Sequence, residues 1–351
     1  MKVAVGVSGG ADSLLSLIRL KEEGYEVVAV HGRFLAQEGA REEAALRGLE
    51  ERCASLSVPL HVLDLRSEFE TCVIKYFEEE YAIGRTPNPC VLCNARIKFG
   101  LFMDAALELG VDKVATGHYV RTAQYEGVGT VLARGVDNIK DQSYFLSLVE
   151  QHRIDKCIFP LGSTTKNETH GELEERKIVP PVPSESQEIC FVPDDDYRAF
   201  LKGRGVDLPV AGNICLEDST VLGQHQGVWQ YTQGQRKGLG VAWREPLYVI
   251  DKDLDKNVLI VGPKPDLATD GCIVSKMNYM VPQELWPETL LVQTRYRQQA
   301  RPTAFLAQGD GGARLDFLEP HARPTPGQIA SIYTTDGIVL AGGIIDSSLD
   351  R

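Results

Sequence analysis

Several features are missing from this 351-residue sequence, and each absence excludes a class of protein. No apolar run approaches the roughly 18 residues that a membrane-spanning helix needs, so we expect no membrane association. Neither an internal repeat nor a low-complexity tract is visible, which argues against a repeat architecture. The chain enters an apolar, strand-like segment at Val3 without a leader pattern, so we expect no signal peptide and a cytoplasmic location.

Positive charge is also scarce, with 37 Lys and Arg against 49 Asp and Glu and a net charge of −12. This balance argues against a general nucleic-acid binder, although binding needs only a local basic stripe. Two candidate stripes are present, Arg295-Tyr296-Arg297 and Gln235-Arg236-Lys237. Gly234, Gly238 and Gly240 surround the second stripe and suggest a loop shaped for a phosphate backbone, with a solvated turn as the plain alternative.

The remaining composition, 43% hydrophobic and 25% charged, is typical of a globular protein, and the length suggests two or three domains. Strands and helices alternate through about residue 160, which predicts an α/β domain with a doubly wound parallel sheet. Short strands with Gly, Pro and Asp turns follow from about residue 205 and predict two small β domains. We therefore expect a domain over 1–165, a connector carrying Cys190 over 166–204, a small β domain over 205–281 and a C-terminal β-barrel over 282–351.

The most informative stretch lies at residues 2–31, which predict a strand, a loop, a helix and a second strand. The loop reads Ser8-Gly9-Gly10-Ala11-Asp12-Ser13 and stands at the carboxyl end of a strand, where open α/β sheets bind ligands. Glycines let the backbone approach a charged group, the helix start favours an anion, and Asp12 can hold a metal ion that bridges phosphates. The spacing matches neither the P-loop nor the dinucleotide pattern. It resembles the pyrophosphate loop of the N-type ATP pyrophosphatases.

Eight cysteines are present, but a disulfide scaffold is not expected in a cytoplasmic chain of this size. Cys90 and Cys93 stand in a proline-stiffened loop before a predicted helix over about 95–109. A helix start and nearby Arg85, Arg96 and Lys98 should lower the pKa of such thiols.

No second Cys-x-x-Cys exists to complete a four-ligand zinc site. The pair plus one distant cysteine suits an iron–sulfur cluster with one open iron, with a redox dithiol or two incidental cysteines as alternatives. Cys190 lies in a short strand predicted over 186–192.

Motifs along nearly the whole chain resemble those of the tRNA-specific 2-thiouridylase family. The motifs that carry the resemblance are Thr86-Pro87-Asn88-Pro89, Cys93-Asn94, Ile97-Lys98-Phe99, Thr116-Gly117-His118-Tyr119, Lys140-Asp141-Gln142-Ser143-Tyr144-Phe145-Leu146, Ser186-Gln187-Glu188-Ile189-Cys190-Phe191, Tyr231-Thr232, Gly234-Gln235-Arg236-Lys237-Gly238-Leu239-Gly240, Arg295-Tyr296-Arg297-Gln298, Thr325-Pro326-Gly327-Gln328 and Gly342-Gly343-Ile344-Ile345.

This resemblance implies an enzyme, a tRNA-uridine 2-sulfurtransferase that adenylates the C2 oxygen of the wobble uridine and replaces it with sulfur. It implies ATP and Mg²⁺ as cofactors, tRNA as partner, and sulfide or a cysteine desulfurase relay as sulfur donor.

The catalytic residues implied are Cys93, Cys190 and Asp12, with Asp12 also holding Mg²⁺. The nucleotide-binding residues implied are Gly6, Val7, Ser8, Gly9, Gly10, Ala11, Asp12, Ser13, Gly32 and Gly117. The tRNA contacts implied are Asn88, Pro89, Cys90, His118, Lys140, Asp141, Gln142, Arg295, Tyr296 and Gln328. On its own, His118 reads as a satisfied core histidine, and its place beside Gly117 at a strand end makes a role in the site equally plausible.

One departure from the family pattern bears on the sulfur chemistry, because Cys90 stands where most members have Asp. The extra thiol favours a version in which Cys90, Cys93 and Cys190 hold a 4Fe–4S cluster whose open iron carries hydrosulfide. In the alternative version, Cys190 carries a persulfide and Cys93 releases the sulfur by forming a disulfide. Two other functions stay open, a sensory iron–sulfur protein and an enzyme that adenylates another substrate. Either sulfur mechanism requires these distant thiols to converge beside the nucleotide pocket.

Overall fold

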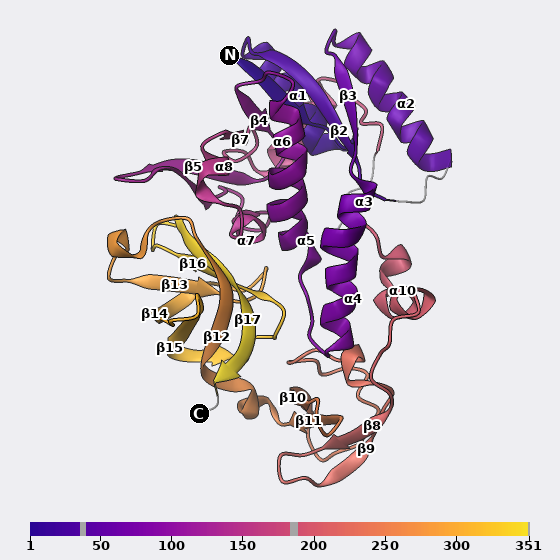
Figure 1. Cartoon of the computed structure of the whole chain (residues 1–351), viewed down its shortest axis with the longest axis vertical. Helices are drawn as coiled ribbons and strands as arrows, with labels where there is room; N and C mark the ends of the chain where they lie inside the picture. The colour runs from indigo at the N-terminus through magenta and orange to yellow at the C-terminus, as the bar shows by residue number, and fades with distance from the viewer. Residues whose placement is uncertain (36–39, 183–188, 350–351) are drawn as a thin grey trace.

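The computed structural model describes residues 1–35, 40–182 and 189–349, which form a parallel-sheet domain, a small mixed sheet and a closed barrel (Figure 1). In Figure 1 the small sheet and the barrel lie below the parallel-sheet domain. Helix α4 (Lys75–Ala82) descends toward them, and the helix that begins with α5 (Pro89–Leu92) rises away from them to α6 (Phe102–Leu107). Within these residues, no helix has the length and apolar character to cross a membrane.

The central sheet of the first domain has the order β3-β2-β1-β4-β7, and all of its strand pairs are parallel. Its strands are β1 (Lys2–Gly6), β2 (Glu26–Arg33), β3 (Leu60–Asp64), β4 (Lys113–Ala115) and β7 (Cys157–Ile158). The strand order reverses between β1 and β4, so the segments that follow these two strands meet at a topological switch point. This confirms the predicted doubly wound sheet and brings the loop after Gly6 beside Gly117.

The helices of this part cover the sheet and carry its loops. They are α1 (Ala11–Glu22), α2 (Ala40–Ser55), α3 (Arg66–Phe69), η1 (Glu70–Ile74), α4 (Lys75–Ala82), α5 (Pro89–Leu92), η2 (Cys93–Leu101), α6 (Phe102–Leu107), α7 (Ser143–Leu146), α8 (Gln151–Ile154) and α9 (Lys166–Glu175). A hairpin of β5 (Val120–Tyr125) and β6 (Gly129–Arg134) projects from the domain and touches the barrel through a bridge from Ala133 to Ile338.

The helix that holds two of the cysteines begins earlier than predicted, at Pro89 rather than near residue 95. Proline suits the first helical position because it has no N–H to leave unpaired there. Cys90 and Cys93 therefore lie in the first turns of a helix, not in a loop before it. From Cys93 to Leu101 the turns are π-helical, a geometry that is often found at functional sites.

The connector contains a capped helix, a proline-rich stretch and a turn. Helix α9 begins with a capping box in which Thr165 and Glu168 bond to each other's backbone N–H. Pro183-Ser184-Glu185 and the first three residues of the strand expected over 186–192 lie outside the described residues. The rest of that expected strand, Ile189–Val192, is a turn, closed by a bond from the Val192 N–H to the Ile189 carbonyl. This part of the strand prediction is wrong, because the bond folds the backbone back on itself.

The second half of the chain is built from short strands. The small sheet has the order β10-β11-β8-β9, and the closed barrel runs β12-β15-β14-β13-β16-β17, which confirms the predicted architecture. The elements are η3 (Pro193–Asp195), α10 (Tyr197–Gly203), β8 (Gly212–Cys215), β9 (Val221–His225), η4 (Val228–Gln230), β10 (Tyr248–Asp253), β11 (Val258–Gly262), η5 (Lys264–Leu267), β12 (Ala268–Tyr279), η6 (Gln283–Leu285), β13 (Leu290–Gln293), β14 (Arg301–Ala307), β15 (Ala313–Ala322), β16 (Ile329–Tyr333) and β17 (Val339–Leu349). Strand β12 pairs with β15 and β17, so the barrel begins before the boundary expected at residue 282.

The parallel-sheet domain and the barrel share one apolar core. A single cluster of buried side chains includes Phe77 and Phe99 of the first domain together with Val274 and Tyr333 of the barrel. Burial of this shared surface fixes how the two parts sit against each other.

Candidate active site

The loop after β1 has a glycine with positive φ and leads directly into a helix, as the sequence predicts. Gly9 has φ +83°, a conformation that favours glycine, and Gly10 precedes the first turn of α1. The Ser8 N–H donates to Ser13 Oγ at 3.1 Å, and the Ser13 hydroxyl donates to the Gly10 carbonyl at 3.0 Å. These bonds fix the loop at the start of a 12-residue helix, where backbone N–H groups favour an anion.

Gly117 lies against this loop. A Cβ placed on Gly117 would lie 2.8 Å from the Asp12 carbonyl carbon and 2.9 Å from the Ser13 nitrogen, so a side chain there would push the loop away. Gly32, at the end of β2, is covered instead by the Phe34 ring, whose nearest atom would lie 2.6 Å from an added Cβ. The expected nucleotide-binding residues thus gather at the carboxyl ends of three neighbouring strands.

The Asp12 carboxylate is held by two residues that sequence reasoning missed. Lys166 Nζ lies 2.7 and 2.9 Å from the two carboxylate oxygens, and the Tyr119 hydroxyl donates to Oδ1 at 2.7 Å. The Tyr119 hydroxyl also lies 3.0 Å from the hydroxyl of Thr169 in α9. The capping box that starts α9 was a readable sequence signal for this helix, but nothing local linked Lys166 to Asp12.

The three expected thiols lie within electrostatic range of one another. Cys90 and Cys93 are three residues apart on one helix face, and both exert a direct electrostatic effect on Cys190. Lys98, one turn along from Cys93, acts electrostatically on all three thiols. Its charge also acts on His118, which directly follows Gly117. Lys98 therefore lies within electrostatic range of the thiols and of His118, the neighbour of Gly117.

The thiols do not have the lowered pKa values that the sequence predicts. Burial raises the pKa of Cys90 and Cys93 and, together with the two neighbouring thiols, raises the pKa of Cys190 to about 12. Cys90 and Cys190 still contact solvent, but the protein around the thiols is dense enough for desolvation to outweigh the charge of Lys98. Arg85 contributes no compensating charge, because its guanidinium bonds to Asp346 and lies beside Glu80.

All eight cysteines are free thiols. Over the described ranges, no group of three or more His, Cys, Asp or Glu converges as a single metal ion would require. The ligands of an iron–sulfur cluster bind separate irons, however, and need not meet at one point. Three partly desolvated thiols from two segments fit the donor set of such a cluster.

Several residues expected to face tRNA instead bond within the protein. His118 Nδ1 lies 2.7 Å from Thr116 Oγ1, and burial lowers its pKa well below the ordinary value, so the ring is neutral. Asp141 is buried and accepts bonds from Arg134 and Ser143, and the Gln142 side chain accepts the Tyr119 N–H. Lys140 is half-buried in the same segment.

The three residues of the C-terminal part that were expected to contact tRNA also bond or pack within the protein. Arg295 donates to the Gln233 and Arg323 carbonyls, and the Tyr296 ring centre lies 4.3 Å from that of Phe145. Gln328 donates to the Thr86 and Pro87 carbonyls. The roles of these residues in tRNA binding stay predictions.

Both β domains form hydrogen bonds with the segment that leads to Asn88, Pro89 and Cys90. The Thr86 N–H bonds to the Pro326 carbonyl at 2.9 Å, and the Thr86 hydroxyl lies 3.4 Å from that of Thr232. The side chain of Lys252, on β10, donates to the Gly84 carbonyl at 2.7 Å, a contact that no sequence motif signals. The position of the first cysteines therefore depends on both β domains.

Comparison with known proteins gives matches along the whole chain. Three family models match in order: the tRNA methyl transferase HUP domain over residues 1–194, the tRNA methyl transferase PRC-barrel domain over 198–263 and the aminomethyltransferase beta-barrel domain over 269–345.

Several curated relatives carry the name tRNA-specific 2-thiouridylase MnmA. The protein of Nitratidesulfovibrio vulgaris is 50% identical over 348 residues, with 98% of this chain and 99% of that protein covered. Those of Oleidesulfovibrio alaskensis and Lawsonia intracellularis are 47% and 46% identical, with 99% of this chain and 99% and 100% of those proteins covered. Among solved structures, the U34-tRNA thiolase NcsA from Methanococcus maripaludis with its 4Fe-4S cluster is similar at 17% identity and a TM-score of 0.38, with 58% of this chain and 63% of that chain covered. That likeness is too weak to support an argument.

Proposed function

The chain belongs to the MnmA family of tRNA-specific 2-thiouridylases, and from that premise we propose that it replaces the C2 oxygen of the wobble uridine of tRNA with sulfur at the expense of ATP. The observation that best supports this proposal is the link between the thiols and the nucleotide loop. Lys98 is a charged neighbour of Cys90, Cys93, Cys190 and His118, and Gly117 packs on Asp12. An adenylated oxygen and a sulfur nucleophile need this proximity.

The first step activates the uridine. The C2 oxygen attacks the α-phosphorus of ATP, a new oxygen–phosphorus bond forms, and pyrophosphate leaves with the electrons of the broken bond. The N–H groups at the start of α1 and the hydroxyls of Ser8 and Ser13 favour the negative charge of the phosphates. Asp12, aligned by Lys166 and Tyr119, is the residue that we assign to Mg²⁺.

The second step delivers sulfur to C2 and expels AMP with the original oxygen. We assign Cys90, Cys93 and Cys190 as the holders of a 4Fe–4S cluster, which, when bound, supplies an iron with an open position for sulfur. Lys98 places a positive charge within electrostatic range of all three cysteines, and the desolvation around them limits hydrolysis of the activated uridine.

The persulfide mechanism is a second candidate, because Cys93 acts electrostatically on Cys190. In that version the terminal sulfur of a Cys190 persulfide attacks C2. The Cys93 thiolate then attacks the Cys190 sulfur, which frees the thiolated tRNA and leaves a Cys93–Cys190 disulfide. An external thiol reductant must supply two electrons before the next turnover, and Cys90 has no role.

The test uses the full-length protein, reconstituted anaerobically with iron and sulfide, an unmodified tRNA transcript, ATP and Mg²⁺. Mass spectrometry of the digested tRNA should detect 2-thiouridine only when ATP is present. The proposal fails if the protein hydrolyses ATP without any need for tRNA, or if the uridine stays unmodified while a different acceptor gains sulfur. In the cell we place this activity in the cytoplasm, with sulfide or a cysteine desulfurase relay as the sulfur donor.

A further inference from the structure

Residues 236–246 of the small β domain form a loop that lines a pocket. Hydrogen bonds and buried side chains fix both ends of this loop. Before the loop, the Gly234 N–H bonds to the Val249 carbonyl at 2.8 Å, and the Val249 N–H bonds to the Gln235 carbonyl at 2.9 Å. Leu239 and Leu247 are buried in the core of the small sheet. Compact surface loops with fixed ends are frequently functional.

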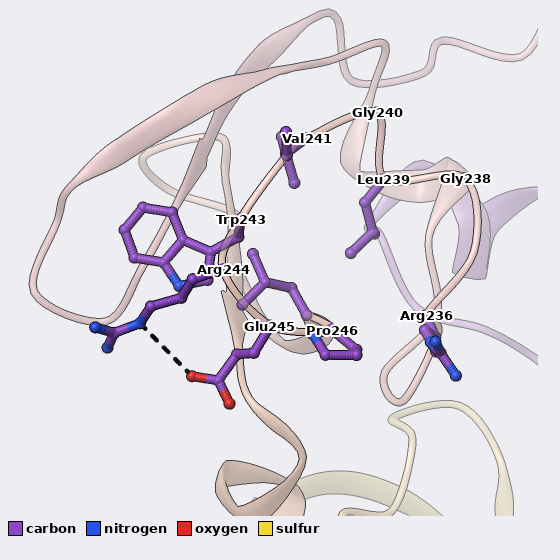
Figure 2. Close-up of a pocket in the computed structure, with 11 residues that line it drawn as sticks. Arg236, Gly238, Leu239, Gly240, Val241, Trp243, Arg244, Glu245 and Pro246 are labelled. Carbon is purple, nitrogen blue, oxygen red and sulfur yellow. Dashed lines mark ion pairs between the residues drawn. The ribbon is translucent and has the colours of Figure 1, made fainter.

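The loop encloses an open pocket of about 480 Å³, which falls in the range of roughly 300–1,000 Å³ that is usual for small-ligand sites. Figure 2 shows Leu239 and Val241 on its inner side, Trp243 and Arg244 at one end and Arg236 at the other. Gly238 and Gly240 have φ of +80° and +70°, so the loop depends on glycine to turn between the charged and aromatic residues.

The lining has the chemistry of a nucleotide site. The Trp243 side chain is 40% exposed, which leaves a large apolar surface in contact with water. The Arg244 guanidinium lies over the Trp243 ring, 5.8 Å from the ring centre. Arg236 and Lys237 are exposed, and Glu245, paired with Arg244 at 3.8 Å, is the acidic residue of the loop. In a chain of net charge −12, this local positive charge is complementary to a phosphate backbone.

The loop also continues directly from the candidate active site. The Thr232 hydroxyl touches that of Thr86, beside Asn88 and Cys90, and the Gln233 carbonyl accepts a bond from Arg295. The chain therefore leads within a few residues from a contact beside Asn88 and Cys90 to the pocket.

We propose that this pocket is a second RNA-binding site, which takes an unpaired nucleotide of the same tRNA. The base stacks on Trp243, and the neighbouring phosphates lie against Arg236 and Lys237. The base must be unpaired, because a paired base inside a helix has no free face for the indole. This inference rests on the proposed function, since it names a further contact with the same substrate.

The experiment measures tRNA binding in the absence of ATP, so its result does not depend on thiolation. Trp229 is buried and Trp286 packs against Phe305, which leaves Trp243 as the exposed indole that a bound base would quench. Trp243→Ala should weaken tRNA binding by about 5- to 150-fold, and Trp243→Phe should retain most of the affinity, because stacking contributes roughly 1–3 kcal/mol per base.

The contribution of the positive charge of Arg236 to tRNA binding is tested separately. Arg236→Ala should reduce the salt dependence of binding by about 0.7 to 0.9 in the slope of log K against log salt. Lys264→Ala removes an exposed charge of the adjacent η5 and should leave affinity and slope unchanged. The proposal is overturned if Trp243→Ala binds tRNA like the parent, if tRNA leaves the fluorescence of Trp243 unchanged, or if free AMP quenches it equally well.

Discussion

The carboxylate of Asp12 and the ammonium of Lys166 form an ion pair across 154 residues of sequence, with Nζ 2.7 and 2.9 Å from the two oxygens. Lys166 is only 8% exposed, and it belongs to the first turn of α9 rather than to the glycine-rich loop. The orientation of the residue that we assign to Mg²⁺ is therefore set by a helix of the connector. Because the connector also carries Cys190, the nucleotide loop and the sulfur site share one supporting segment.

Replacing Lys166 with Met should slow tRNA-dependent pyrophosphate release by about 10- to 100-fold, because the Asp12 carboxylate loses its alignment. Lys166→Arg should restore part of the rate by keeping the charge, whereas Lys202→Met, at an exposed position on α10, should have no effect. Thermal unfolding of each variant separates lost alignment from lost folding. A Lys166→Met enzyme that folds and releases pyrophosphate at the parent rate would show that the ion pair has no part in adenylation.

Cys190→Ala should abolish formation of 2-thiouridine while pyrophosphate release on tRNA continues, because sulfur delivery and adenylation use different residues. The matched control is Cys72→Ala, which removes a partly exposed thiol of η1 outside the group of three. Both products are measured on the same reaction, one by mass spectrometry and the other by a coupled phosphate assay. Thiolation that persists in Cys190→Ala would remove this residue from the mechanism.

Cys90→Ala distinguishes the two sulfur mechanisms. Protein purified without oxygen should be brown, with broad absorbance near ~400 nm, and the variant should lose both the colour and the thiolation. The persulfide mechanism predicts instead a colourless parent and an active Cys90→Ala variant. Iron and sulfide analysis of parent, Cys90→Ala and Cys72→Ala provides the quantitative comparison.

The burial of Lys252 against the Gly84 carbonyl should make the stability of the fold depend on pH. Burial lowers the pKa of Lys252 from its ordinary value of 10.5 to about 7. Between these two values the unfolded chain binds the proton that the folded protein has released, so the free energy of unfolding should rise with pH.

This rise is at most about 1.4 kcal/mol per pH unit and should be missing in Lys252→Met. Urea unfolding of both proteins at several pH values gives the difference between their free energies of unfolding. The contributions of other titratable groups are the same in both proteins and cancel in this difference. Equal slopes in the two proteins would show that Lys252 keeps its proton in the folded state.

Much of the nucleotide site could be predicted from local sequence. The strand–loop–helix unit around Gly9 follows from the glycines and the hydrophobic pattern of adjacent residues. The doubly wound sheet and the terminal barrel were predictable for the same reason, since hydrophobic periodicity changes clearly near residue 205. Gly117 was assigned to the nucleotide only by the family resemblance, and its approach to Asp12 depends on a strand order that local sequence does not encode.

The contacts that support the site could not be predicted, because they join residues far apart in the chain. Neither the pair of Asp12 with Lys166 nor the bond from Lys252 to Gly84 has a local signal. The thiol pKa values were predicted in the wrong direction because sequence shows nearby charges but not burial, and here burial has the larger effect. Arg295 was expected in a basic stripe, and Gln328 was assigned to tRNA only by the family resemblance. The structure adds that both side chains donate to backbone carbonyls of other segments, which no local pattern signals.

The most direct test of the central claim follows the oxygen that leaves the uridine. A tRNA whose wobble uridine carries a heavy oxygen isotope at C2 is treated with the enzyme, ATP and a sulfur source, and the AMP released is analysed by mass spectrometry. Adenylation at C2 predicts that the heavy oxygen appears in AMP in step with the 2-thiouridine formed. Heavy oxygen recovered in water or in pyrophosphate, with AMP unlabelled, would contradict the account.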